Sequence, residues 1–169
     1  MKIQKIILIC FCILSIIGCK IQYSLGNIGS IPEDANTFYV ENFSSIATQA
    51  SPLTSQIISE NLKTLILSQS RLNTGDDYAD LTFSGVITTY RVENAGIQSN
   101  DQAAQNKLTI SIKVNYKNKN NDKDDFEKTF KASELFDANA SLLDIENELI
   151  IAISEQINQM IFDEAFGDW

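Results

Sequence analysis

"KLTISIKVNYK", residues 107–117, alternates between apolar and polar side chains at every step. Lysine, threonine, serine and asparagine occupy one parity, and only apolar residues occupy the other: Leu108, Ile110, Ile112, Val114 and Tyr116. Successive side chains of a β-strand point to opposite faces of the sheet. The stretch therefore predicts a strand with one face in a hydrophobic core and the other face polar.

Three further strands are predicted around this stretch. Residues 37–43 are rich in β-formers, residues 80–93 begin with an alternating pattern, and residues 126–131 return after a polar hairpin loop at residues 118–125. The sheet is thus predicted to have four strands.

Two amphipathic helices are predicted to pack on this sheet. Ser51-Pro52 has the form of a helix start, with an N-cap serine and proline at the first helical position. Ser141-x-x-Asp144 is similar to a capping box and begins a second helix. Apolar residues recur at helical spacing from residue 53 to about residue 70 and from residue 142 to residue 161.

The predicted order β-α-β-β-β-α indicates one α+β domain over residues 37–169. Two helices can cover only one face of a four-stranded sheet. We therefore expect a two-layer α/β sandwich whose second sheet face is bare and carries threonine, serine and lysine.

The start of the chain has the pattern of a lipoprotein signal peptide. Lys2 and Lys5 precede an apolar run at residues 6–17, which is too short for a bilayer core that needs about 20 residues. The run ends Ile16-Ile17-Gly18-Cys19 and resembles the bacterial lipobox. This resemblance implies cleavage after residue 18 and acylation of Cys19. An N-terminal helix with a buried cysteine is the alternative.

Residues 19–36 have the composition of a tether, with two glycines, a proline and no sustained period. Cys10 and Cys12 belong to the predicted signal peptide and Cys19 is predicted to carry lipid, so no thiol is left for a disulfide. The predicted mature chain has 11 basic and 22 acidic side chains. Nucleic acid is an unfavourable partner for such a charge.

No catalytic or metal-binding pattern stands out. The chain has no histidine, which excludes a Ser-His-Asp triad and imidazole metal ligands. Asp76-Asp77 with Asp80, and Asp122 with Asp124-Asp125, lack the spacing of a calcium loop, so we expect solvated loops there. We therefore expect no enzyme, no cofactor and no resident metal.

Three lysines form a row on the predicted bare face. Lys107, Lys113 and Lys117 share one parity and project together, so their ammonium groups could pair with phosphates. Lysines on an exposed strand more often serve solubility and block edge pairing, and this alternative stays open.

Four stretches carry a family resemblance: "CKIQYS" (19–24), "DLTFSGVITTYRV" (80–92), "AAQNKLTISIKV" (103–114) and "IFDEAFGDW" (161–169). They resemble the LptE-type lipopolysaccharide-assembly lipoproteins of Bacteroidetes-like bacteria. The resemblance implies two helices on a four-stranded sheet. It also implies a lipoprotein that plugs an LptD-type outer-membrane barrel, helps the barrel to assemble and assists delivery of lipopolysaccharide to the cell surface.

The residues behind Cys19 bear on location. An aspartate directly after the lipidated cysteine would resemble an inner-membrane retention signal, but this chain has Lys20 there. No acidic run follows Cys19, such as marks surface-exported lipoproteins in Bacteroidetes-like cells. We therefore expect attachment to the outer membrane, facing the periplasm. Two alternatives remain: a periplasmic lipid-binding or transport-auxiliary lipoprotein, and a surface-exposed ligand-binding lipoprotein.

Overall fold

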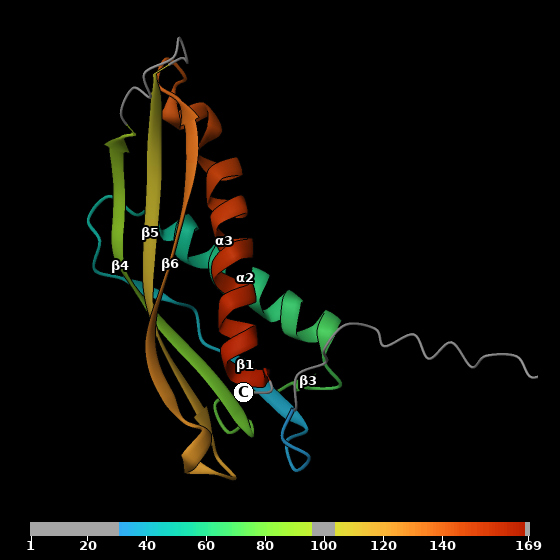
Figure 1. Ribbon diagram of the computed structural model, residues 1–169. Helices are drawn as coiled ribbons and strands as arrows, with labels where there is room; N and C mark the ends of the chain where they lie inside the picture. The colour runs from blue at the N-terminus through green and yellow to red at the C-terminus, as the bar shows by residue number, and fades with distance from the viewer. Residues whose placement is uncertain (1–30, 96–103, 168–169) are drawn as a thin grey trace, which may run out of the picture.

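The computed structural model describes residues 31–95 and 104–167 (Figure 1). The predicted signal peptide (1–18), Cys19 and most of the predicted tether lie outside these residues. The described part holds the sheet and both of its helices.

Three long antiparallel strands form the body of the sheet (Figure 1). They are β4 (Leu81–Asn94), β5 (Gln105–Asn118) and β6 (Phe126–Asp137). The alternating stretch lies in the central strand β5, where Ile112 pairs with Ile87 of β4 and Phe130 of β6. This register places the apolar parity of all three strands on one face.

Three short parallel strands complete the sheet on the β4 side: β1 (Thr37–Val40), β2 (Ser44–Ser45) and β3 (Asn73–Thr74). The order is β3-β1-β4-β5-β6, and β2 also pairs with β4. The predicted α+β sandwich is confirmed. Its sheet has six strands in the described residues, not four, because β2 and β3 have two residues each and leave no pattern in the sequence.

The two helices are α2 (Pro52–Gln69) and α3 (Leu142–Phe166). The Thr54 N–H donates to Ser51 Oγ (3.3 Å), which confirms the predicted start of α2. The predicted capping box of α3 is wrong, since the Ser141 side chain makes no capping hydrogen bond. The Asp144 N–H donates to the Ser141 backbone carbonyl instead (3.1 Å).

Both helices cover the apolar face of the sheet. α3 runs along β5 and β6, and α2 packs against β1, β2 and α3 (Figure 1). Side chains join α3 to the strands: Tyr90 donates to Glu146, and Lys128 Nζ pairs with Glu164 Oε2 at 2.6 Å. Of the helices in the described residues, none has the length and apolar character that a membrane crossing requires.

An aromatic cluster fills the space between α3 and the sheet. The ring centroids of Phe83 and Tyr116 are 4.9 Å apart, and the Phe166 ring lies 6.1 Å from Phe83 and 6.4 Å from Tyr116. All three are at most 1% exposed. A side chain of this size contributes about 1.5–3 kcal/mol when fully buried, so the cluster is a main source of stability.

A β-bulge at Thr88 changes the parity of β4. The register shifts between Ile87 and Thr89, so Ile87 and Tyr90 both face the core. Without the bulge, the alternation that begins at Leu81 would turn Thr89 and Arg91 inward. The bulge therefore keeps one face of β4 apolar along its length.

Arg71 fixes the point where the chain enters the domain. Its guanidinium donates to the backbone carbonyls of Pro32 (2.8 Å), Glu33 (3.1 Å) and Ala35 (2.9 Å). Asn120 Nδ2, in the β5–β6 loop, donates to the Asp34 carbonyl (3.3 Å). The chain thus enters at the end of the sheet that carries this loop.

Asp80 joins the start of β1 to the start of β4. Its Oδ2 accepts from the backbone N–H groups of Asn36 (2.9 Å) and Thr37 (3.0 Å) and from Thr37 Oγ1 (3.0 Å). These hydrogen bonds favour the charged form and hold the pKa of the Asp80 carboxyl below its ordinary value.

We expect Asp80→Asn to lower the free energy of unfolding at pH 7 by about 1–2 kcal/mol, because hydrogen bonds to a charged acceptor are lost. The contribution of Asp80 is fully present above the ordinary aspartate pKa of about 3.9, and it is lost as pH falls through the lower pKa of the folded state. Urea unfolding at pH 7 and at acid pH should show the difference narrowing. A difference that is independent of pH would contradict this role.

Gly85 permits a close contact with Phe43. A Cβ at position 85 would lie 2.9 Å from Phe43 Cδ2 and 3.0 Å from Cδ1. Phe43 is 2% exposed and its backbone N–H donates to Ser59 Oγ (2.9 Å), so the ring has little room to move.

We expect Gly85→Ala to lower the free energy of unfolding by about 1–3 kcal/mol, as overpacking does. Phe43→Leu removes the clashing ring atoms, so the double variant should be more stable than the sum of the single effects by at least about 1 kcal/mol. Urea unfolding of the four proteins measures this coupling. Strictly additive effects would show that the two residues do not clash.

Candidate functional site

The face of the sheet that points away from the helices is the candidate site. We call it the outer sheet face and define it by the outward parity of β4, β5 and β6. Most of its residues are hydroxylic, amide or charged: Thr82, Ser84, Val86, Thr89, Arg91 and Glu93; Lys107, Thr109, Ser111, Lys113, Asn115 and Lys117; Glu127, Thr129, Lys131, Ser133, Leu135 and Asp137.

Nothing in the described chain covers this face. Both helices lie on the opposite side, as Figure 1 shows. Exposed residues on it include Lys113, Thr129 and Ser133. In the middle, Thr109 and Ser111 are 5% and 7% exposed because their neighbours on three strands surround them. The prediction of a bare polar face agrees with the described residues.

The three predicted lysines all lie on the outer sheet face. Lys107 Nζ is 3.9 Å from Glu93 Oε2, and Lys113 Nζ is 2.7 Å from Glu127 Oε1. In the described residues, no carboxylate lies within 4.0 Å of the Lys117 ammonium. Two of the three charges are thus partly neutralised within the protein.

Strand geometry separates these lysines widely. At about 3.3 Å per residue, Lys107 lies about 20 Å from Lys113, and Lys113 about 13 Å from Lys117. A single phosphate cannot bind all three. They form a line of separate positive charges along the face.

Two further basic residues belong to this face. Arg91 pairs with Thr109, two residues from Lys107, and Lys131 pairs with Ser111, two residues from Lys113, so each lies near one lysine of the row on a neighbouring strand. The alternation of β4 before residue 88 points Arg91 inward, and only the bulge turns it outward. The doublet Thr88-Thr89 before the buried Tyr90 is the signal that could have revealed the change of parity.

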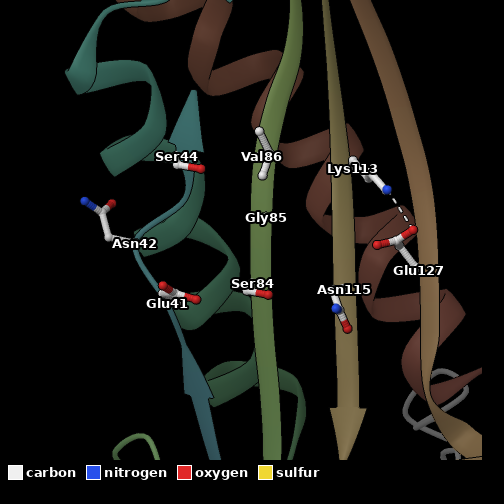
Figure 2. A pocket seen from close by; sticks show the side chains of 9 residues that line it. All are labelled: Glu41, Asn42, Ser44, Ser84, Gly85, Val86, Lys113, Asn115 and Glu127. Carbon is white, nitrogen blue, oxygen red and sulfur yellow. Dashed lines mark ion pairs between the residues drawn. The ribbon is translucent and has the colours of Figure 1, made fainter. Parts of the chain in front are cut away.

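A shallow depression of about 360 Å³ lies where β2 meets β4. Figure 2 shows that Lys113 and Glu127 border it on one side and Glu41, Asn42 and Ser44 on the other. Its lining offers both hydrogen-bond donors and hydrogen-bond acceptors. This composition suits polar groups of a ligand or a partner.

The two aspartate clusters have local structural partners. Asp76 Oδ1 accepts from the Tyr78 N–H (3.0 Å), and Asp124 accepts from the Asn118 and Asn121 side chains (2.8 and 2.9 Å). Within residues 31–95 and 104–167, no group of three or more candidate ligands could hold a metal ion. These carboxylates thus stabilise their own turns.

Sequence comparison gives a family match. The model of the family described as "LptE: Lipopolysaccharide-assembly" matches residues 35–165. No curated protein matches the sequence.

Solved structures give matches to the fold. A hypothetical protein, CT253, from Chlamydia trachomatis has a TM-score of 0.55 at 7% identity, and the match covers 79% of this chain and 99% of that one. Lipoprotein B from Nitrosomonas europaea, described as uncharacterized, has a TM-score of 0.53 at 10% identity, with 81% and 84% covered. At such low identity these similarities concern the fold alone.

Proposed function

Because the chain belongs to the LptE family of lipopolysaccharide-assembly proteins, we propose that it is a non-enzymatic outer-membrane lipoprotein that plugs a lipopolysaccharide-translocating β-barrel of the LptD type. In this role it helps the barrel to assemble and assists delivery of lipopolysaccharide to the cell surface.

The bare outer sheet face is the observation that carries the proposal. Lumens of large outer-membrane barrels are polar, whereas their outer walls are apolar. Fourteen residues of β5 extend for about 46 Å, which exceeds the hydrocarbon thickness of about 30 Å. A face of this length and polarity matches the inner wall of such a barrel.

The membrane anchor in this proposal is acylated Cys19, with residues 1–18 removed. Two acyl chains suffice for stable attachment. Eleven residues lie between Cys19 and Ile31, and the twelve steps from one to the other reach at most about 40 Å. The end of the sheet at which Arg71 binds residues 32–35 can therefore lie near the periplasmic side of the outer membrane.

A lipid carrier is the weaker alternative. Such a protein needs room for acyl chains between helices and sheet. Here the rings of Phe83, Tyr116 and Phe166 occupy that layer, joined by Phe162 at 5.0 Å from Phe166. Acyl chains would have to displace the core. Lipid mass spectrometry on the purified protein should accordingly find no stoichiometric acyl ligand beyond the anchor.

We expect the full-length lipoprotein, purified from native membranes in mild detergent, to retain a large β-barrel protein. Thr129→Trp with Ser133→Trp enlarges two exposed residues of the outer sheet face and should reduce the recovered barrel at least fivefold. Gln56→Trp with Gln69→Trp, on the exposed side of α2, is the matched control. Recovery of free monomer only, or equal losses in both variants, would overturn the plug role.

The lysine row is the proposed lipopolysaccharide contact. We expect Lys107→Glu, Lys113→Glu and Lys117→Glu together to weaken binding of the lipoprotein to purified lipopolysaccharide at least fivefold at low ionic strength. The loss should narrow as salt increases, because exposed charges are screened.

The matched control for this variant is Lys63→Glu with Lys123→Glu and Lys128→Glu, which changes the net charge equally at positions off the outer parity of the sheet. Equal effects of the two triple variants would show that net charge alone matters. Unchanged binding at low salt would exclude the row as a contact and leave the barrel test unaffected.

A further inference from the structure

A groove between α2 and α3 lies on the opposite side of the molecule from the outer sheet face. We call it the helix groove; its volume is about 440 Å³. Asn61 and Leu65 of α2 face Ile151, Glu155, Asn158 and Gln159 of α3 across it. The plug role uses none of these residues.

An incomplete hydrogen-bond arrangement lies in the helix groove. Asn158 is 1% exposed, and its Nδ2 donates to the Ile58 carbonyl (3.1 Å), which fixes the orientation of the amide. Its Oδ1 has no donor in the described chain. An unsatisfied buried acceptor costs about 1–3 kcal/mol, and a donor from an entering group would remove this cost.

An acidic stripe lies along α3 beside the groove. Asp144, Glu148, Glu155 and Asp163 recur at near-helical spacing, and all four are exposed. They extend over about 29 Å at 1.5 Å per residue. In residues 31–95 and 104–167, no lysine or arginine lies within 4.0 Å of any of them. The stripe is therefore complementary to a basic ligand.

Apolar side chains accompany the charges. Ile151 lies within the acidic stripe and is 44% exposed. Leu65, which lines the groove, is half-buried. A ligand that covers these groups gains apolar contact as well as charge pairing.

We propose that the helix groove binds a basic amphipathic segment of a partner polypeptide. Its cations pair with the acidic stripe, its apolar residues cover Ile151 and Leu65, and an N–H group donates to Asn158 Oδ1. An anionic lipid or lipopolysaccharide would meet like charge here, which disfavours both as ligands of the groove. The site is separate from the outer sheet face and does not depend on the plug role.

Photocrosslinking in the native bacterium tests this site. The full-length lipoprotein carries p-benzoylphenylalanine in place of the exposed groove residue Gln159, and the crosslinked peptide is sequenced by mass spectrometry. We expect a peptide of another polypeptide in which lysine and arginine outnumber acids. Glu148→Lys with Glu155→Lys should reduce the yield at least fivefold, whereas Glu33→Lys with Asp122→Lys, an equal charge change at other exposed positions, should not.

Salt gives a second measurement that requires no charge variant. In membranes, crosslinking of the parent protein should fall as sodium chloride rises from 0.05 to 0.5 M. Crosslinks to lipid, to an acidic segment or to a second copy of this chain would overturn the proposal, as would absent crosslinks or yields insensitive to charge reversal and salt. Barrel recovery with the tryptophan variants is measured separately, so either proposal can fail alone.

Discussion

The register of β5 is the constraint on which the rest of the structure depends. Its apolar parity pairs with inward residues of β4 and β6, as in the row Ile87, Ile112 and Phe130. A slip of one residue would turn every apolar side chain of β5 to solvent. The bulge at Thr88 preserves this arrangement, because it keeps Tyr90 in the core despite the change of pattern in β4. The register of β5 therefore determines which residues occupy each face of the sheet.

The same register places basic and acidic side chains on opposite sides of the molecule. Residues 91–131 hold eight basic side chains, and several of them project from the outer sheet face. α3 contains acids and no base, and it packs on the inner face. The asymmetry along the sequence thus becomes an asymmetry between two opposite surfaces. The basic and acidic segments lie on opposite surfaces because the sheet has one apolar face, and α3 packs on that face.

Local periodicity allowed the sequence to predict the long elements and the bare face. It could not predict β2 and β3, whose two residues pair only through tertiary contacts, nor the capping geometry at Ser141. Arg91 was missed as an outer-face residue because a bulge is set by pairing with β5. The ion pair of Lys113 with Glu127 and the helix groove at Asn158 join residues from different elements, so no local pattern contains them.

The two surfaces share a physical feature that favours lasting cover by partners. Thr109 Oγ1 on the outer sheet face and Asn158 Oδ1 in the helix groove are both buried and lack a partner in the described chain. Each unsatisfied group costs about 1–3 kcal/mol, and only a group placed at hydrogen-bond distance can remove that cost. The isolated domain therefore keeps an unsatisfied polar atom on each of two opposite sides, and a partner that covers either side, as proposed above, can supply the missing hydrogen bond.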